Sequence, residues 1–503
     1  MIKAAAVFSD NMVLQRNKNV RIFGTCGEDC REITVIVPEL EKSASAVIRN
    51  GRWEAVLPPM KACGRCTVVI SSENDRIVFS DAAVGEVWLA GGQSNMEFEL
   101  QNEKHGSQAL AECGNENVRF YYTPKCEMIG EKLLAEEEKS RWTLPDKESA
   151  KCWSAVGYYF AKELSRRLGV TVGVIGCNWG GTSASAWMDR KYLEQDSRLR
   201  PYIDDYDKAC EGRTSTQMIA EYDEYTAYHA AWEKRMQQCY AENPAIKWDE
   251  VLKICGENRY PGPMGIKNPM RPCGLYETMI SRIAPYTLAG YIYYQGESDD
   301  HRPDTYQELL TALIQNWRSD WHDEELPFMF VQLPMFRYEA DPDTRSWAKL
   351  REAQMSVFRT VKNTGIAAAL DCGEFNNIHP IDKTAVAHRL YLQAMYHVYG
   401  DTDKMTAFPP MYRDFEVCGN KMKLRFDNCD GFEVRGELTG FELSGADGDF
   451  HDAQAEICGD SIEISSAEVD TPVSARFQWT NYSEVTLFGK NGIPVPPFTI
   501  QFP

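Results

Sequence analysis

The sequence predicts an α/β protein whose central parallel sheet is flanked by a β-module at each end. Apolar runs that end in Gly-rich turns alternate with helical stretches through the middle of the chain. Short alternating or β-branched runs, separated by Gly, Asn and Pro, fill both ends. Strands that alternate with helices indicate a parallel sheet covered on both faces, whereas closely spaced short strands indicate separate β-modules.

Residues 1–82 are predicted to form a β-sandwich-like module. They contain the strand-like runs VRIFGTC, EITVIVP and CTVVISS and show no long helical period. Residues 405–503 are predicted to form a second β-module, with KMKLRFDN, SARFQWTN and VTLFGKNG as candidate strands. The chain therefore divides into two small β-modules around a larger centre.

Residues 83–404 are predicted to form the α/β centre. Its candidate strands are VGEVWLAGG, VTVGVIGCNWGG, LAGYIYYQGE, PFMFVQLP and TGIAAALDCG, and its candidate helices include 153–168, 304–321, 345–361 and 382–400. Residues 190–270 interrupt this alternation and are polar, aromatic and helical. They indicate an inserted helical subdomain, which either covers a substrate cleft or is a decorative insertion.

Composition excludes several classes of function. The 503 residues include 54 Lys plus Arg and 74 Asp plus Glu, which gives a net charge of −20. Such a balance disfavours sequence-independent nucleic-acid binding, which requires basic surface. No apolar run reaches the roughly 18 residues of a membrane span, and no signal peptide is visible, so we expect a cytoplasmic protein without membrane partners. The 16 Cys are then expected to be mainly reduced.

Ser94 and His379 are the first candidates for chemistry. Ser94 follows a predicted strand and two glycines, in WLAGGQSNME. His379 stands in CGEFNNIHPIDK, a loop between a predicted strand and a long helix. Ligands of open α/β sheets bind outside the carboxyl ends of the strands, where both residues are expected. Taken alone, such a Ser is more often a helix cap, and such a His is more often structural.

Other strand ends supply groups that stabilise an oxyanion. Gln295 and Glu297 lie in YYQGES, where an amide can donate a hydrogen bond and a carboxylate can orient its neighbours or cap a helix. Gly180 and Gly181 in NWGGTS offer backbone N–H groups. A nucleophile, a base and several donors at one sheet edge together favour a serine esterase.

The chain resembles the sialate O-acetylesterase family of SGNH hydrolases. The resemblance is carried by collinear motifs that run nearly from end to end: FSDNMVLQR (8–16), VWLAGGQSNMEF (87–98), NWGGTSASAW (178–187), RPCGLYETMI (271–280), YYQGES (293–298), WAKLREAQ (347–354), IHPIDK (378–383) and NGIPVPPF (491–498). It implies a flavodoxin-like three-layer α/β/α core with a parallel sheet, and no cofactor or metal.

The resemblance also implies roles for the candidates. Ser94 would be the nucleophile and His379 the general base. The donors to the oxyanion would be the Ser94 backbone amide, the Gln295 side chain and one glycine of WGG, with Gly181 preferred over Gly180. Glu297 matches the family's QGE in type, but its role stays open.

The triad acid departs from the common SGNH pattern. A D-x-x-H arrangement would place an Asp where this chain has Asn376. Asn can orient an imidazole but cannot stabilise its charged form as a carboxylate does. Asp371, Glu374, Glu297 and a backbone carbonyl are the alternatives, and the sequence does not decide between them.

The predicted function is hydrolysis of O-acetyl esters on a sugar or oligosaccharide. The family implies a sialate 9-O-acetylesterase, and acetylxylan or other acetylated oligosaccharides are the alternative substrates. A second hypothesis is an inactive carbohydrate-binding protein on an esterase scaffold, which the unusual acid position favours and the retained candidate residues oppose. A sialate carboxylate would require a local cation within a strongly acidic protein. The sequence does not indicate an oligomeric state.

Overall fold

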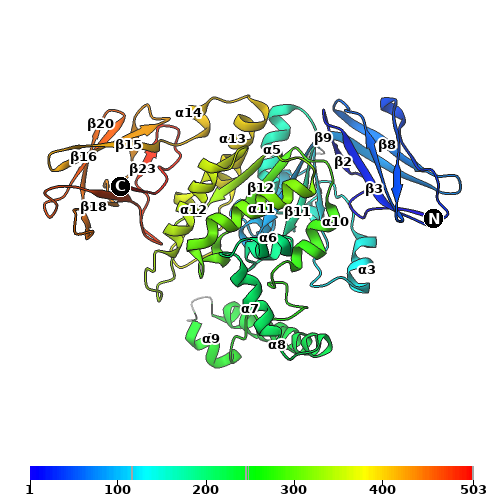
Figure 1. Cartoon of the computed structure of the whole chain (residues 1–503), viewed down its shortest axis with the longest axis horizontal. Coiled ribbons are helices and arrows are strands. Elements are labelled where there is room, and N and C mark those ends of the chain that lie inside the picture. Colours follow the sequence, from blue (N-terminus) through cyan, green and yellow to red (C-terminus); the bar gives the residue numbers. More distant parts are fainter. Residues whose placement is uncertain (115–116, 244–245, 247, 501–503) are drawn as a thin grey trace.

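The protein has an α/β centre with β-sheets at both ends of its longest axis, as the computed structural model in Figure 1 shows. Helices from the 190–270 region project from one side of this centre. The α/β class with additional β-sheets is confirmed. The described residues are 1–114, 117–243, 246 and 248–500.

Parallel strands form the middle of the central sheet. Their bounds are β9 (Arg76–Gly92), β10 (Val118–Tyr122), β11 (Val172–Asn178), β12 (Gly290–Tyr294), β13 (Phe328–Gln332) and β14 (Thr364–Ala368). Across the sheet they run β10, β11, β9, β12, β13, β14. With β10 taken as an added edge strand, the other strands follow the doubly wound order 2-1-3-4-5.

Helices cover both faces of this sheet. The main ones are α5 (Ala155–Leu168), α11 (Tyr306–Asp320), α12 (Ser346–Thr360) and α13 (Thr384–Ala394). In β9, the ring of Trp88 lies 5.1 Å from that of Phe160 in α5, whereas Gly91 packs against Trp317 of α11. Because neighbouring positions of a strand alternate between faces, α5 and α11 lie on opposite sides. Helix α13 packs beside α5, and α12 beside α11.

The N-terminal strands form two sheets, one of which continues into the central sheet through β9. These strands are β1 (Ile2–Ala4), β2 (Val13–Gln15), β3 (Val20–Cys26), β4 (Thr34–Val37), β5 (Lys42–Ser45), β6 (Val47–Arg49), β7 (Arg52–Leu57) and β8 (Cys63–Ser71). The sheet with β2, β4, β5 and β8 continues into the central sheet, and β1, β3, β6 and β7 form a separate sheet. The first part of β9 pairs antiparallel with β8, and its second part pairs parallel with β11 and β12. The predicted boundary after residue 82 therefore falls inside one strand, and both regions share a buried apolar cluster.

Buried Glu86 of β9 anchors the N-terminal motif FSDNMVLQR. Its carboxylate accepts hydrogen bonds from Gln15 Nε2 at 2.8 Å and Arg16 Nε at 2.5 Å. Gln15 Oε1 in turn accepts from the backbone N–H of Val87 at 2.8 Å. This motif therefore holds the strand that leads to the sheet edge.

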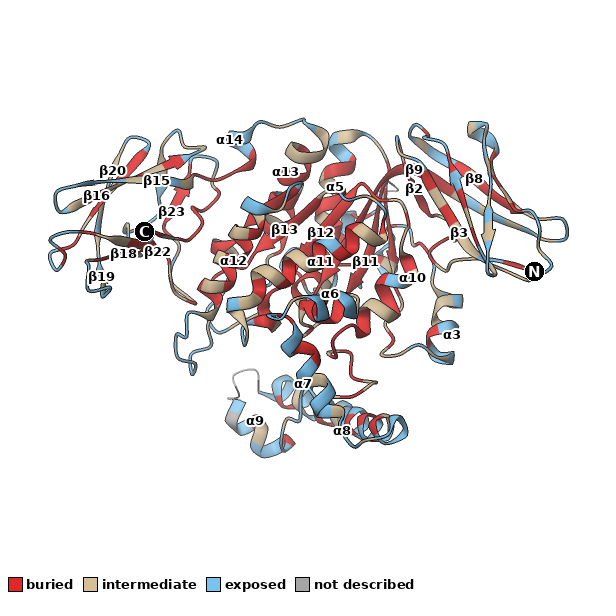
Figure 2. Cartoon of the chain, in the orientation of Figure 1, coloured by how far each residue is buried: buried red, intermediate tan, exposed pale blue. Residues whose placement is uncertain are grey.

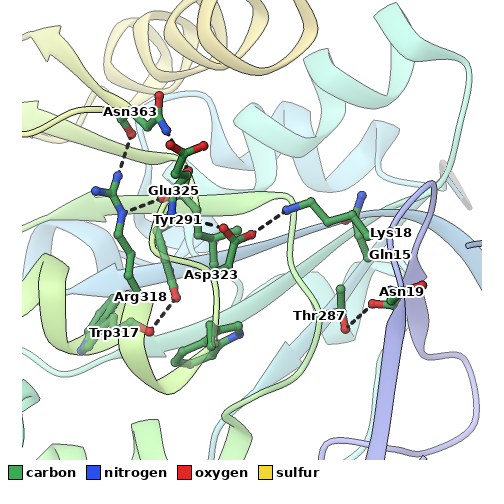
Figure 3. A network of polar contacts seen from close by, with 12 residues as sticks. Gln15, Lys18, Asn19, Thr287, Tyr291, Trp317, Arg318, Asp323, Glu325 and Asn363 are labelled. Atoms are coloured by element: carbon green, nitrogen blue, oxygen red, sulfur yellow. Dashed lines mark hydrogen bonds and ion pairs between the residues drawn. The ribbon is translucent and has the colours of Figure 1, made fainter. Parts of the chain in front are cut away.

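A second polar contact joins the N-terminal module to the centre (Figure 3). Lys18 Nζ donates to Asp323 Oδ2 at 3.3 Å, and Thr287 Oγ1 donates to the carbonyl oxygen of Asn19 at 3.3 Å. Nearby, Arg318 Nη2 donates to the carbonyl oxygen of Asn363 at 3.0 Å. The first two bonds tie the module to the loops before β13 and β12, and the third lies within the centre.

Residues 190–270 carry helices α6 (Arg190–Gln195), α7 (Arg200–Cys210), α8 (Ser215–Glu242) and α9 (Trp248–Cys255). A capping box between Thr214 and Gln217 starts α8. Helices α8 and α9 enclose their own apolar cluster, which includes Trp232 and Val251. Figure 2 shows these helices as mostly exposed, in contrast to the buried sheet of the centre.

The C-terminal sheets enclose a separate apolar cluster. Their strands are β15 (Met411–Cys418), β16 (Lys421–Asp427), β17 (Phe432–Val434), β18 (Phe441–Ser444), β19 (Phe450–Asp452), β20 (Gln454–Cys458), β21 (Ser461–Ser465), β22 (Ser474–Phe477), β23 (Leu487–Gly489) and β24 (Phe498–Ile500). Asn481 joins them to the centre, because its carbonyl oxygen accepts from Phe336 N at 2.9 Å and its Oδ1 accepts from Trp347 N at 3.0 Å.

The remaining α-helices are short. They are α1 (Ser94–Glu97), α2 (Gly106–Glu112), α3 (Glu131–Lys139), α4 (Lys147–Ala150), α10 (Ser281–Ile283) and α14 (Lys404–Ala407).

We expect Glu86→Ala to lower the free energy of unfolding by about 2 kcal/mol, since it leaves Gln15 and Arg16 without their carboxylate. Urea denaturation measures this loss. Glu54→Ala is the control, because it removes a carboxylate from a more exposed pair with Arg21, which is expected to contribute about 0.5 kcal/mol. Equal losses in the two variants would contradict the anchoring role of Glu86.

Candidate active site

Ser94 stands at the first position of α1, directly after β9. The turn into α1 depends on Gly92, which has φ +135° and would place a Cβ 2.1 Å from the carbonyl oxygen of Tyr294. Only glycine fits there. The N–H groups of a first helical turn lack partners within their helix, and no described residue accepts a hydrogen bond from the Ser94 N–H.

His379 lies beside Ser94. Its Nε2 is 2.8 Å from Ser94 Oγ, although 285 positions separate the two residues. The histidine loop joins β14 to α13, and the His379 N–H donates to Asn377 Oδ1 at 3.1 Å. Burial lowers the pKa of His379, the positive charge of Lys383 lowers it further, and Glu97 opposes this shift. The imidazole is therefore neutral near pH 7 and able to accept a proton from Ser94.

The candidate acids have other partners. Arg389 holds Asp371 through both guanidinium nitrogens. Glu374 accepts from Asn377 Nδ2 at 2.7 Å and from the N–H of Ile381 at 3.1 Å.

Asn376, which occupies the usual position of the acid, has φ +62° and accepts from the N–H of Glu339. Within the described chain, neither a carboxylate nor a backbone carbonyl is hydrogen-bonded to the His379 ring. The Ser94–His379 pair is therefore a dyad in this structure.

Gln295 is buried beside the site, but its amide donors are already used. Its Nε2 donates to Asp299 Oδ2 at 2.6 Å and to the carbonyl oxygen of Thr182 at 3.2 Å. Both partners can only accept, which fixes the orientation of the amide. Gln295 thus has no N–H left for an oxyanion in this structure, and it joins the 182 loop to Asp299 instead.

Gly180 and Gly181 differ in whether the backbone N–H already has a hydrogen-bond acceptor. The Gly180 N–H donates to Glu97 Oε2 at 2.6 Å, whereas no described residue accepts from the Gly181 N–H. Gly181 has φ +73°, and a Cβ there would lie 2.0 Å from the Tyr260 hydroxyl. Gly181 is therefore the glycine with a backbone donor available.

Glu297 lies behind the dyad and does not contact it. Its Oε1 accepts from Asn95 Nδ2 at 2.7 Å, and its Oε2 has no hydrogen-bond partner among the described residues. Burial raises the pKa of Glu297 above its ordinary value, and the hydrogen bond from Asn95 and the charge of Lys383 oppose this shift. Glu297 is thus part of a buried polar group that also includes Asn95 and Lys383.

A cavity of about 490 Å³ borders the turns that contain Gly181 and Ser298. Gly181 and Ser298 line one side of it, and Ser298 N donates to Gln93 Oε1, next to Ser94. Much of the remaining lining comes from the inserted helices and the loop that follows them: Tyr202, Asp205, Tyr206, Ala209, Tyr260, Pro261, Met264 and Met270. The insertion therefore lines a cavity that reaches Gly181 and Ser298, whereas Ser94 and His379 are not themselves part of its lining.

No cluster of three or more His, Cys, Asp or Glu side chains suited to a metal ion occurs among the residues that the structure describes. All 16 cysteines are free thiols. Within the described ranges, no helix combines the length and apolar character needed to cross a bilayer.

Comparisons with known proteins agree with these motifs. Residues 262–392 match the family model described as "Carbohydrate esterase, sialic acid-specific acetylesterase". Sialate O-acetylesterase of Mus musculus is 26% identical over 542 residues, covering 99% of this chain and 94% of the mouse protein. The Homo sapiens enzyme of the same name is 25% identical, covering 98% of this chain and 91% of its own length.

A solved structure gives the same result. The crystal structure of a carbohydrate acetylesterase from Xanthomonas citri matches with a TM-score of 0.78 and 27% identity, and the match covers 100% of both chains. The resemblance to the sialate O-acetylesterase family is confirmed. The segment that matches the family model includes Gln295, Glu297 and His379, and the full-length relatives extend the similarity over nearly the whole chain.

Sequence reasoning missed Asn95, Glu97 and Lys383. Each lies inside a motif quoted for the family resemblance, since Asn95 and Glu97 belong to GQSNMEF and Lys383 ends IHPIDK. Their position in these motifs was the available signal. Their partners come from other strand ends, however, and only the fold brings those together.

We expect Gly181→Ala to destabilise the protein more than Gly169→Ala. Both glycines have φ near +65 to +73°, but nothing lies within 4 Å of a Cβ at Gly169, whereas a Cβ at Gly181 would overlap Tyr260. Backbone strain costs each variant about 1 kcal/mol, and the overlap adds a further loss only in Gly181→Ala. Urea denaturation of both variants measures the difference, and equal losses would contradict the contact with Tyr260.

Proposed function

We propose that this protein is a serine esterase that removes O-acetyl groups from sugars, with acetylated sialic acid as substrate. The 2.8 Å contact between Ser94 Oγ and His379 Nε2, at the carboxyl ends of the strands, carries the proposal. The similarity to sialate O-acetylesterases along the chain supports the reaction class.

In the first half of the reaction, Ser94 Oγ attacks the acetyl carbonyl carbon while His379 Nε2 takes the hydroxyl proton. The tetrahedral oxyanion accepts hydrogen bonds from the N–H groups of Ser94 and Gly181, both of which are available. The imidazolium then gives its proton to the departing sugar oxygen, and the acetyl group stays on Ser94.

In the second half, water attacks the acetyl-enzyme while His379 again accepts a proton. Collapse of the second tetrahedral intermediate releases acetate and restores the Ser94 hydroxyl. Both nucleophilic attacks use the neutral imidazole as base, the form that its environment favours.

The fold supports an SGNH assignment. The strand order β11, β9, β12, β13, β14 is that of a flavodoxin-like sheet, with helices on both faces. We assign residues 83–404 to the catalytic domain with its insertion at 190–270, and residues 1–82 and 405–503 to the flanking β-modules. Strand β9 belongs to both the N-terminal module and the catalytic domain. The first boundary is therefore the point in β9 where its partner strand changes from β8 to β11, and no linker separates the two regions.

The cavity supports a sugar substrate. Tyr202, Tyr206 and Tyr260 provide aromatic faces and hydroxyls, a combination suited to a molecule with both apolar and polar faces. Arg302 brings a cation into the same lining, where it pairs with Asp205. The Arg302 guanidinium lies over the Tyr202 ring, 4.9 Å from its centroid, and is the one Lys or Arg side chain among the described residues of this lining that could meet a sialate carboxylate.

The deciding experiment measures acetate release from O-acetylated sialic acids and from acetylated xylo-oligosaccharides. We expect turnover of the sialates, and a loss of at least about 1,000-fold in Ser94→Ala. Faster turnover of the xylo-oligosaccharides would transfer the proposal to a neutral substrate. Equal rates for wild type and Ser94→Ala would leave a carbohydrate-binding protein without esterase activity.

We expect Arg302→Met to raise KM for an acetylated sialate by about tenfold and to leave KM for a neutral acetylated sugar unchanged, because it removes one charge-assisted hydrogen bond. Arg198→Met is the matched control, since Arg198 forms exposed ion pairs outside the cavity. An equal effect on both substrates would contradict a carboxylate contact.

The pH dependence of kcat/KM is expected to have its acid midpoint below 6.5, the ordinary pKa of histidine. The pKa of His379 is lowered, so its base form persists to lower pH, and activity is lost only as pH falls through this lowered value. Initial rates on an aryl acetate between pH 4 and 8 test the expectation. A midpoint above 7 would contradict it.

A further inference from the structure

We propose that Glu297, Asn95 and Lys383 form a buried hydrogen-bonded relay that fixes the Ser94 helix to the His379 loop and replaces the missing triad carboxylate as the positioning device. The inference rests on the proposed esterase function and assigns a role to Glu297. None of the three residues is hydrogen-bonded to the dyad side chains within the described chain, so they are positioning residues rather than catalytic ones.

The relay runs through one amide. Lys383 Nζ donates to Asn95 Oδ1 at 2.6 Å, and Asn95 Nδ2 donates to Glu297 Oε1 at 2.7 Å. An ammonium group only donates and a carboxylate only accepts, which fixes the orientation of the Asn95 amide. The second Asn95 N–H donates to the carbonyl oxygen of Ile378 at 3.0 Å.

These contacts join the elements that carry the reaction. Asn95 follows Ser94 in α1, and Ile378 precedes His379 in the histidine loop. Lys383 is the N-cap of α13, directly after that loop, and Glu297 begins the turn after β12. A shift of the loop relative to α1 would therefore strain the bond to Ile378 together with the Ser94–His379 contact.

Burial of the three polar side chains of the relay costs desolvation free energy. Asn95 and Lys383 are each 1% exposed, and Glu297 is 4% exposed. Buried ion pairs are frequently no more stabilising than apolar side chains of similar volume, so stability alone does not explain this group. Removing one member leaves an uncompensated charge, whereas removing both charges does not.

The relay also places a positive charge near the base. Burial lowers the pKa of Lys383 to about 8, and Glu297 opposes this shift. The Lys383 ammonium lies over the rings of Phe98, at 4.7 Å, and Tyr294, at 5.8 Å. The charged groups that act on His379 are Lys383 from α13 and Glu97 from α1, and they act in opposite directions.

The histidine loop has a second support on its other side. Asn377 accepts from the His379 N–H and donates to Glu374, which also accepts from the N–H of Ile381. With Asn95 holding Ile378, the backbone on both sides of His379 is fixed by side chains. The imidazole is thus oriented through its backbone, where a triad carboxylate would act on its ring.

The test compares Glu297→Met, which removes the acceptor of the Asn95 amide, Lys383→Met and the double variant with wild type. We expect kcat on an aryl acetate to fall about 100-fold in each single variant, with KM changed less than about threefold, because a displacement of about 1 Å at the reacting atoms costs that much. The double variant is expected to lose no more than the worse single variant, since members of one unit are not additive. It also removes both buried charges, and circular dichroism verifies its folding.

Glu86→Gln is the matched control, because Glu86 is a buried carboxylate in a separate hydrogen-bonded group, in the middle of the buried part of β9. We expect its kcat to equal that of wild type. The relay is overturned if the double variant is folded and its kcat lies within about threefold of wild type, or if the losses in the single variants multiply in the double variant.

The titration of the His379 ring tests the relay independently of the proposed esterase function, because it does not require turnover. Histidine-selective NMR follows the titration of the His379 ring, which we expect to move to higher pH in Lys383→Met and in the double variant, because a nearby positive charge is removed. The titration is expected to stay in place in Glu86→Gln. An unchanged His379 titration in both Lys383 variants overturns the relay even if wild type hydrolyses no ester, whereas an inactive wild type with shifted titrations overturns only the esterase proposal.

Discussion

Close approach of β9 and β12 at their carboxyl ends is the constraint on which the site depends. Gly92 has no side chain to hold the strands apart, and the Gln93 N–H donates to the carbonyl oxygen of Tyr294 at 3.1 Å. Gln93 Oε1 then accepts from the Ser298 N–H at 3.2 Å. The turn that presents Ser94 and the turn after β12 are therefore one hydrogen-bonded unit, to which the histidine loop is attached.

The fold class and the sheet edge that carries Ser94 and His379 could be predicted because their signals are local, whereas the roles of these two residues came from the family resemblance. Strand runs that end in glycine turns place Ser94 and His379 at one edge of a parallel sheet, and this requires no knowledge of side-chain contacts. Partners of polar groups could not be predicted in this way. Asp371 had the right chemistry for the acid, but Arg389 holds it, and Gln295 had the right donor, but Asp299 accepts from it.

The net charge of the chain does not describe the charge around the candidate site. The chain carries −20, yet Lys383 lies buried beneath the dyad and Arg302 lines the adjacent cavity. Exposed charges are screened beyond about 8 to 10 Å in physiological salt, whereas buried charges are screened much less. The charge that a bound anion meets therefore depends on nearby groups such as Arg302 and its partner Asp205, and the acidic surface does not by itself exclude a sialate.

Gly181 connects chemistry to substrate selection. Its left-handed backbone leaves the N–H available to the proposed oxyanion, and its missing Cβ admits the Tyr260 hydroxyl from the inserted region. A side chain here would disturb both at once. In the proposed mechanism one residue would therefore serve both the reacting carbonyl and the cavity wall, through its N–H and through its contact with Tyr260. The helices of this insertion enclose a cluster of their own, which gives that wall a firm support independent of the central sheet.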